Sequence, residues 1–406
     1  MNKKLRLAYL VSHPIQYQAP LLRRIAQEPD IDLTVFFGSD FSVRGYQDKG
    51  FGVGVKWDVP LLDGYKHEFL PVLRDNATNS ITSPLSHGIL SRLKGRNGEA
   101  AFDALWVHGY LTINALHGMV AAKALGVPVL LRAESWLGGR RSGSGARLVA
   151  KRLFFAVLKG LVDAVLPIGT RNASHWRHYL GDDLPMFLMP YAVDNEYFQR
   201  QCKEAAPRRG ALQQELGLDP LRPVILFASK LQTRKRCGDL LEAYLRLSVD
   251  GGEPHPYLVI VGDGEERVAL EKRAAASGLN SIRFCGFRNQ SELPRFFDLA
   301  SVFVLPSQYE QWGLIVNEVM NAGRAVIVSD DVGSQPDLVR DRVEGCVFPV
   351  GDVDGLTACL RRTLDRPESA AVMGQRGLER IKQWSFEEDV LGLRQALASV
   401  TRKIEA

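Results

Sequence analysis

Cysteines and long apolar runs are both scarce in this sequence. Only five cysteines occur among 406 residues; they are widely spaced and no two form a CxxC pair. A disulfide framework and a zinc knuckle are therefore not supported, and a reducing compartment fits best. No uninterrupted apolar run approaches the length that spans a bilayer, and the run after the basic start ends at Ser12-His13-Pro14. We interpret it as a first strand, and we expect a cytoplasmic protein.

A strong excess of either charge is also missing, because the net charge is only +5. The distribution is nevertheless uneven: residues 1–193 carry a net charge of +8 and residues 194–406 one of −3. The sequence shows no basic stripe interleaved with aromatic residues, so we expect no nucleic-acid partner. An anionic partner for the first half stays open, including the inner face of a membrane.

The segment 145–160 is basic and strongly apolar at once. Its cations are Arg147, Lys151, Arg152 and Lys159, and leucine, valine and phenylalanine residues stand between them. As a helix, such a segment can settle on an anionic membrane surface. The same apolar face can instead cover a sheet, and we favour this second interpretation. Peripheral membrane contact remains the alternative.

Short apolar runs alternate with helical patterns along nearly the whole chain. Runs that are continuous rather than alternating are typical of parallel strands buried on both faces. A chain of this length also favours more than one domain. The sequence therefore predicts an α/β protein with two doubly wound domains. The predicted strands are Leu5–Val11, Leu33–Phe37, Ala104–Val107, Val127–Leu131 and Ala164–Ile168, then Val224–Ala228, Leu258–Val261, Ile282–Phe284, Val302–Leu305 and Ala325–Val328.

The domain boundary is expected near residues 200–222, which lack an apolar period and end in prolines. We assign residues 1–195 to an N-terminal domain and residues 196–384 to a C-terminal domain. A last helix is predicted from about Phe386, because Ser385 and the acidic residues after it are typical of an N-cap and a first helical turn.

Four cations follow the predicted strand at 224–228. They are Lys230, Arg234, Lys235 and Arg236. Ligands of open parallel sheets bind beyond the carboxyl ends of the strands, where such side chains can pair with a diphosphate. A solvated turn that leads into a helix explains this segment equally well.

Two carboxylates follow the predicted strand at 302–305. Glu310 falls in the loop, and Glu318 lies eight residues later in a helix that begins near Gly313. Carboxylates accept hydrogen bonds from sugar hydroxyls, and the opening of a helix leaves backbone N–H groups free. From this segment alone we favour a capping Glu310 and a surface Glu318. The free N–H groups are those around Trp312, Gly313 and Leu314.

Six segments of the second half occur in the order and spacing of a known family. They are Ser229-Lys230-Leu231 with Lys235, Val261-Gly262-Asp263-Gly264, Phe284-Cys285-Gly286-Phe287, Pro306-Ser307, Glu310 with Glu318, and Ala325-Val326-Ile327-Val328-Ser329. This ordered set, from about residue 224 to about residue 350, resembles the C-terminal domain of retaining glycosyltransferases of family 4. The resemblance implies the GT-B fold: two Rossmann-like domains that face a cleft, the second holding the nucleotide-sugar. Residues 385–406 are then expected to cross back to the first domain.

The resemblance also implies roles for individual residues. Lys230 and Lys235 hold the diphosphate, Glu318 accepts hydrogen bonds from the ribose hydroxyls, and Glu310 contacts the donor sugar. The family usually has arginine in place of Lys230. An arginine guanidinium can donate two hydrogen bonds to one phosphate, whereas the Lys230 ammonium group acts as a point charge. The implied catalytic residues are Lys230, Lys235, Glu310 and His108, and the implied donor-binding residues are Glu318, Gly286, Phe287, Gly262, Trp312, Gly313 and Leu314.

In the first half the resemblance is looser. The glycine pair that the family has after its first strand is missing from residues 12–20. His108 follows a strand at the position where relatives place a histidine that faces the donor sugar, although a lone histidine is as often structural. On the acceptor side we place His13, Gln16, Tyr17 and Glu134.

No metal or other cofactor is expected. Gly262-Asp263-Gly264 is not a dinucleotide fingerprint, because Arg267 stands where the third glycine belongs. Asp352 and Asp354 resemble a metal-binding pair but precede a helix, so capping is the favoured use.

The sequence therefore predicts a retaining, metal-independent glycosyltransferase. It would move a hexosyl unit from a nucleoside-diphosphate sugar to a saccharide, glycolipid or other hydroxyl acceptor, in polysaccharide or glycolipid biosynthesis. Two alternatives stay open: a nucleotide-sugar epimerase of the same fold, and a catalytically silent subunit that binds sugar-nucleotides.

Overall fold

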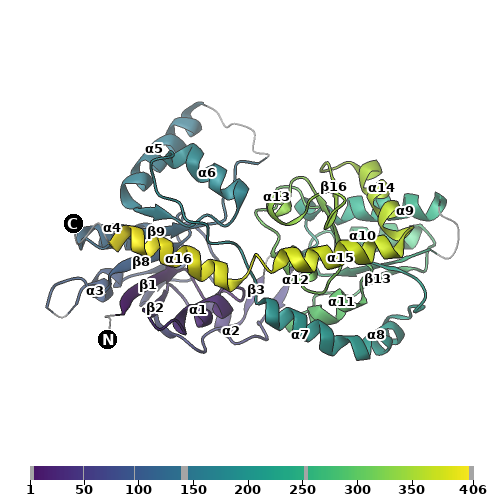
Figure 1. The fold of residues 1–406 in the computed structure, drawn as a ribbon, viewed down its shortest axis with the longest axis horizontal. Coiled ribbons are helices and arrows are strands. Elements are labelled where there is room, and N and C mark those ends of the chain that lie inside the picture. Colours follow the sequence, from purple (N-terminus) through teal and green to yellow (C-terminus); the bar gives the residue numbers. More distant parts are fainter. Residues whose placement is uncertain (1–3, 49, 96, 139–144, 251–254, 402–406) are drawn as a thin grey trace. The chain divides into compact units, whose positions relative to one another are not determined.

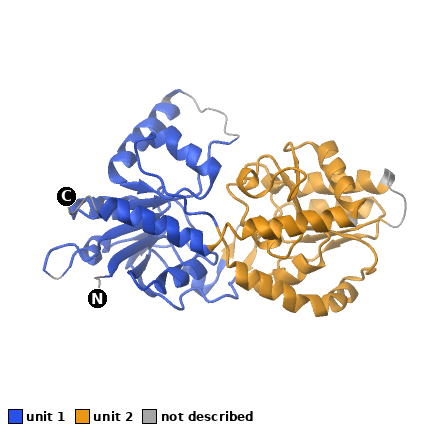
Figure 2. Cartoon of the chain, in the orientation of Figure 1, with its two compact units in different colours: residues 1–46, 55–191, 386–406 blue, residues 47–54, 192–385 orange. Residues whose placement is uncertain are grey.

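The computed structural model describes residues 4–48, 50–95, 97–138, 145–250 and 255–401 (Figure 1). The chain divides into two compact units, which are coloured separately in Figure 2. Unit 1 comprises residues 1–46, 55–191 and 386–406, and unit 2 comprises residues 47–54 and 192–385.

Unit 1 is built on a six-stranded parallel sheet with the strand order β10-β9-β8-β1-β2-β5. The central strand β1 is completely apolar after Arg6 and lies between β2 and β8, which explains its continuous apolar sequence. The strands are β1 Leu5–Val11, β2 Ile31–Phe37, β5 Lys66–Phe69, β8 Ala104–His108, β9 Val129–Arg132 and β10 Ala164–Val165; two short pairs, β3 Tyr46–Asp48 with β4 Val53–Val55 and β6 Val72–Arg74 with β7 Leu85–Ser86, stand apart.

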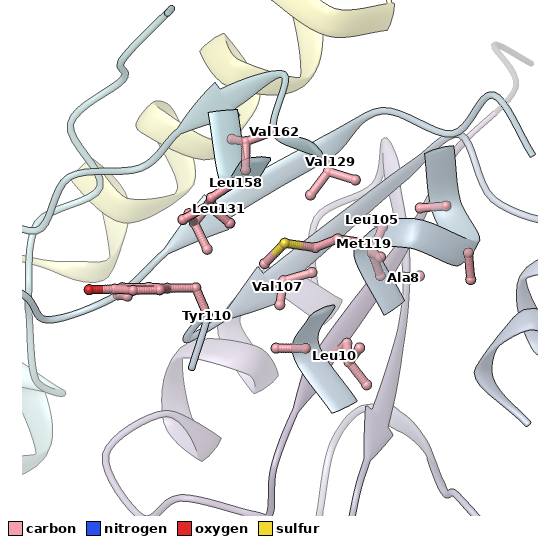
Figure 3. Packing of buried hydrophobic residues seen from close by; sticks show 14 of the residues in the cluster. Ala8, Leu10, Leu105, Val107, Tyr110, Met119, Val129, Leu131, Leu158 and Val162 are labelled. Atoms are coloured by element: carbon pink, nitrogen blue, oxygen red, sulfur yellow. The ribbon is translucent and has the colours of Figure 1, made fainter. Parts of the chain in front are cut away.

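Helices cover both faces of this sheet. One core cluster joins the sheet to α3, α4, α5 and α6, and Figure 3 shows Leu10, Val107, Met119, Leu131 and Leu158 packed within it. The other cluster joins the sheet to α1 and α16. The helices are α1 Ala19–Ala26, α2 Phe41–Arg44, α3 Ile89–Leu93, α4 Ile113–Ala124, α5 Gly145–Leu161, α6 Thr170–Leu180 and α16 Phe386–Thr401.

The last helix, α16, belongs to unit 1, as the sequence predicts. An apolar stripe along α16 packs into the unit 1 core; it comprises Val390, Leu393, Ala396, Leu397 and Val400. A buried ion pair adds to this contact: Arg132 donates to Asp389 at 3.0 Å and to two backbone carbonyls of residues 189 and 190. Gly392 lies so close to the Leu188 carbonyl that a Cβ would come within 1.9 Å of its oxygen.

Unit 2 repeats the architecture with the strand order β13-β12-β11-β14-β15-β16, again all parallel. Its core cluster gathers apolar side chains of these strands and of α9, α10, α14 and α15. The strands are β11 Val224–Ala228, β12 Tyr257–Val261, β13 Ile282–Phe284, β14 Val302–Leu305, β15 Ala325–Ser329 and β16 Gly345–Phe348. The helices are α7 Asn195–Ala205, α8 Arg209–Leu216, α9 Cys237–Asp250, α10 Arg267–Ala276, α11 Leu293–Leu299, α12 Leu314–Met320, α13 Gln335–Leu338, α14 Val353–Leu364 and α15 Pro367–Ile381, with 3-10 turns η1 Ala206–Arg208, η2 Thr233–Lys235 and η3 Gln290–Glu292.

The division between the two units falls between residues 191 and 192, a little before the stretch 200–222 near which the sequence predicts the domain boundary. Much of this stretch is helical and belongs to unit 2. Asp194 caps α7 by accepting a hydrogen bond from the Tyr197 N–H, and Phe198 and Cys202, four residues apart, bury one side of the helix. Because only two apolar residues of α7 are buried, its sequence shows little helical periodicity of apolar residues, and sequence reasoning therefore missed the helix.

Candidate functional site

The loops after β11, β12 and β13 meet at the carboxyl edge of the unit 2 sheet. The Gly262 N–H donates to the Gly286 carbonyl at 2.8 Å, and the Leu231 N–H donates to the Asp263 carbonyl at 2.8 Å. Gly262 has a φ of +135°, and a Cβ there would come within 1.9 Å of the Ser229 carbonyl oxygen. Only glycine allows this approach, so steric demand explains Gly262 without any ligand.

Lys235 and Glu310 form a buried ion pair at this edge. Lys235 ends the turn η2, Glu310 lies in the loop after β14, and the Lys235 Nζ donates to the Glu310 Oε2. Both residues are less than a tenth exposed. Burial lowers the pKa of Lys235, as does nearby Arg234, while Glu310 opposes the shift. The Arg234 guanidinium lies 3.7 Å from the same carboxylate oxygen, so two cations converge on one anion.

The backbone fixes the position of Glu310. Its N–H donates to the Asp331 carbonyl at 3.2 Å, and its carbonyl accepts from the Gly333 N–H at 2.9 Å. A helix cap, which the sequence alone favoured, is therefore not the use of this side chain: α12 begins at Leu314 behind Gly313, whose φ is +87°, and has no side-chain cap.

Trp312 is an internal residue rather than an exposed ring. Its Nε1 donates to Asn317 Oδ1 at 3.0 Å, and its ring packs on Trp384 with the centroids 5.2 Å apart. The side chain thus anchors the loop and α12, and only the backbone of residues 312–314 remains for the donor role that the resemblance implies.

Glu318 lies one turn into α12 and is only partly exposed. Burial raises the pKa of its carboxyl group to about 8. No described side chain compensates this burial with a hydrogen bond or an ion pair. The interpretation as an ordinary surface residue was therefore wrong, because an exposed glutamate has no such shift.

Lys230 already has an anionic partner from the segment 47–54 of unit 2. Its Nζ donates to both carboxylate oxygens of Asp48, at 2.8 and 2.9 Å, and lies 4.7 Å above the ring of Phe51. Phe51 in turn makes an edge contact with Phe287, with the centroids 4.8 Å apart. Two residues to which the resemblance assigns donor binding, Lys230 and Phe287, are thus held by one short segment. Sequence reasoning missed Asp48 and Phe51, because nothing in their local pattern indicates a contact across 180 residues.

A second polar cluster lies at the carboxyl edge of the unit 1 sheet, around Glu134. Tyr17 donates to Glu134 Oε1 at 2.8 Å, and the Tyr191 hydroxyl donates to the same oxygen. The Nε2 of His108 lies 3.8 Å from it. Burial raises the pKa of Glu134, but the hydrogen bonds outweigh this and the pKa ends below its ordinary value. Burial lowers the pKa of His108, whose Nδ1 has no hydrogen-bond partner among the described residues.

His13 and Gln16 lie near this cluster in sequence but do not join the hydrogen bonds to Glu134. His13 bonds Ser12 at 2.9 Å and packs against Phe41, and burial lowers its pKa to about 4. For the Gln16 side chain, the described part of the chain offers no hydrogen bond. Tyr191, which sequence reasoning missed, comes directly after the segment that bonds to β10.

No three metal-binding side chains gather among the described residues. Asp352 caps α14 by accepting a hydrogen bond from the Gly355 N–H, as predicted. Asp354, the other half of the pair, bonds Arg246. Within the described residues, no helix is both long and apolar enough to cross a bilayer.

Part of unit 2 matches the model of a known protein family. The family model described as glycosyl transferases group 1 matches residues 209–380, which hold β11 to β16 and the Lys235–Glu310 pair. Residues 209–380, less than half of the chain, thus resemble the glycosyl transferases group 1. The GT-B fold predicted from the sequence is confirmed, because solved structures of this fold align with nearly the whole chain.

Individual group 1 relatives match different shares of the chain. The α-D-kanosaminyltransferase of Streptomyces kanamyceticus is 33% identical over 162 residues, 40% of this chain and 41% of that protein. The α-maltose-1-phosphate synthase of Mycobacterium tuberculosis is 27% identical over 340 residues, 78% of this chain and 84% of that protein. The structure of Anabaena HepE in complex with UDP aligns with a TM-score of 0.71 over 98% of this chain and all of that chain, at 15% identity. The alignment with the kanosaminyltransferase thus covers less than half of that protein.

Proposed function

We propose that this protein is a retaining glycosyltransferase that transfers a hexosyl unit from a nucleoside-diphosphate sugar to a hydroxyl acceptor. The observation that carries the proposal is the convergence of Lys235 and Arg234 on Glu310 at the carboxyl edge of the unit 2 sheet. Buried charges of both signs, fixed by backbone contacts, are suited to a substrate with a charged part and a hydroxyl-rich part.

In this proposal the diphosphate is bound by Lys235 and Lys230. As the bond from the anomeric carbon to the phosphate oxygen breaks, negative charge grows on the leaving diphosphate. A cation that is already buried, such as Lys235, stabilises that charge more strongly than a solvated one. Because this interaction strengthens towards the transition state, it lowers the barrier rather than merely tightening binding. We propose no metal ion for this step.

Glu318 and Glu310 are proposed to bind the two sugar rings of the donor. Glu318 is a carboxyl group whose burial no described side chain compensates. The two hydroxyls of a ribose supply donors of the kind that this oxygen pair lacks. Glu310 would accept from the transferred hexose once the diphosphate shares the charge of Lys235.

The cluster in unit 1 is proposed to serve the transferred sugar and the acceptor. His108 is held neutral by burial, and its Nδ1 is left to bond a substrate hydroxyl. His108 and the hydroxyls of Tyr191 and Tyr17 lower the pKa of Glu134, whose side chain stays about a quarter exposed. Retention is proposed to proceed by front-face attack, in which the departing phosphate takes the proton of the acceptor hydroxyl.

Similar proteins support the choice of donor. The structures of Anabaena HepE include complexes with UDP and with UDP-glucose. The relatives named above transfer a kanosaminyl group or form maltose 1-phosphate, according to their names. We therefore propose a nucleoside-diphosphate hexose as donor, and a role in polysaccharide or glycolipid biosynthesis.

The Lys235→Ala variant tests the proposal. With donor and acceptor panels, kcat should fall by about two orders of magnitude or more, since removal of one oxyanion-stabilising group costs about 10²–10³ in other enzymes. Lys382→Ala is the control, because Lys382 is an exposed lysine paired with Glu379 in the same unit. Unfolding curves of each variant separate a folding defect from a catalytic one. A folded Lys235→Ala variant with near-normal turnover would remove the diphosphate role, and an epimerised sugar formed from donor alone would favour the epimerase instead.

A further inference from the structure

The outer face of helix α5 is apolar, although its inner face already packs in the core. Phe155 and Leu158 are buried against the unit 1 sheet, and Figure 3 shows Leu158 among the core side chains. On the other side, Val149, Leu153 and Val157 are 56%, 64% and 66% exposed. These three residues follow at intervals of four, so they form one stripe along the helix. A helix that only covers a sheet has a polar outer face, which α5 lacks.

The charges on α5 are all positive. The helix contains no aspartate or glutamate, and its cations are Arg147, Lys151, Arg152 and Lys159. Two of them have partners: Lys159 bonds Asp183 at 2.8 Å, and the Lys151 Nζ lies 4.3 Å above the ring of Tyr179. Arg147 and Arg152 are exposed, and the structure assigns them no ion pair within the described residues. They are therefore available to an anion outside the chain.

The neighbouring helix α4 also carries exposed apolar residues. Its exposed residues include Ile113 at 41% and Val120 at 53%, seven positions apart and hence on one side of the helix. Unit 2 shows no comparable stripe among its described residues: its exposed large apolar side chains are Leu221, Val268 and Val372, on three separate segments. The apolar surface is therefore specific to unit 1, whose half of the chain also carries the excess positive charge.

We propose that the outer face of α4 and α5 docks on an anionic lipid bilayer. The docking face comprises Ile113, Val120, Val149, Leu153 and Val157, with Arg147 and Arg152 beside it. Apolar side chains enter the boundary between headgroups and acyl chains, while the arginines remain at the level of the lipid phosphates. A second copy of this chain fits the face less well, because a two-fold contact would bring the unpaired arginines of both copies together.

Vesicle binding of the full chain tests this proposal. The wild type should sediment with vesicles of phosphatidylcholine and phosphatidylglycerol but not with phosphatidylcholine alone, and added salt should weaken the binding. The double variant Leu153→Ser with Val157→Ser should bind about tenfold or more weakly, since two apolar side chains leave the interface. The variant Arg147→Ala with Arg152→Ala should lose part of the affinity and of the salt dependence.

Val268→Ser with Val372→Ser, on the outside of unit 2, is the matched control and should bind like the wild type. All substituted positions are exposed, so the variants should keep the circular dichroism and melting temperature of the wild type. Failure of the wild type to bind the anionic vesicles, or equal binding by the Leu153→Ser, Val157→Ser variant, would overturn the proposal. So would a dimer in solution that only this variant dissociates. Nucleotide binding should stay unchanged throughout, which separates this result from the fate of the proposed transferase activity.

Discussion

Replacement of Asp48 by asparagine measures the contribution of Lys230 to nucleotide binding. In the structure Asp48 holds the Lys230 ammonium through both carboxylate oxygens, so a diphosphate that binds Lys230 must compete with it. Asparagine keeps the Oδ1 that accepts from the N–H groups of Gly50 and Phe51, and the local turn should persist. The negative charge is lost, together with the second oxygen that accepts from Lys230.

The size of the effect follows from the exposure of the pair. The Lys230 and Asp48 side chains are 31% and 11% exposed, which places the pair near the upper end for surface ion pairs, about 1 kcal/mol. Removal of this competition should lower the Kd for a nucleoside diphosphate by roughly two- to fivefold, since 1.4 kcal/mol corresponds to a factor of ten. Isothermal titration calorimetry with the nucleotide that the wild type binds best measures this change.

A matched control is Asp239→Asn, which removes a similarly exposed carboxylate from Arg236 in the same unit. This variant should leave the Kd unchanged. An unchanged Kd for Asp48→Asn would mean that Lys230 does not bind the diphosphate. A weakened affinity would mean that Asp48 itself contacts the nucleotide, and either result would refute the competition.

Three further predictions concern stability. Burial raises the pKa of Glu318 from its ordinary 4.5 to about 8. The free energy of unfolding should therefore fall as the pH rises from 4.5 to 8. Denaturant titrations at a series of pH values measure this decrease, and the Glu318→Gln variant should show a smaller one. Gly392→Ala should lower the melting temperature by several degrees because its Cβ meets a backbone carbonyl, whereas Gly160→Ala, with open space around it, should not lower it. Asp389→Ala should cost about 3–5 kcal/mol in denaturant unfolding, because it leaves the buried Arg132 guanidinium without its carboxylate; a loss below 1 kcal/mol would contradict this.

The strands in the middle of both sheets could be predicted because burial on both faces demands continuous apolar runs. The inner strands β1, β11 and β14 have the predicted bounds, as does the edge strand β13. The edge strand β5, with the sequence Lys-His-Glu-Phe, was missed because an edge position tolerates polar residues. β10, Ala164–Val165, is shorter than predicted, although the Leu166 N–H still donates to the Leu131 carbonyl of β9.

The candidate site was predictable only where it lies in one local motif. The proximity of Lys235 and Glu310 follows from the rule that the carboxyl ends of neighbouring parallel strands share an edge, since β11 and β14 are neighbours. The hydroxyl of Tyr191 on Glu134 and the pair of Asp48 with Lys230 could not be predicted, because both depend on long-range packing that leaves no local pattern.

A crystal structure of the chain with a nucleoside diphosphate tests the central claim most directly. We predict diphosphate oxygens within hydrogen-bond distance of the Nζ atoms of Lys235 and Lys230, ribose hydroxyls on Glu318, and Asp48 released from Lys230. A nucleotide bound elsewhere, with Lys235 still paired to Glu310 alone and Lys230 still held by Asp48, would contradict the account.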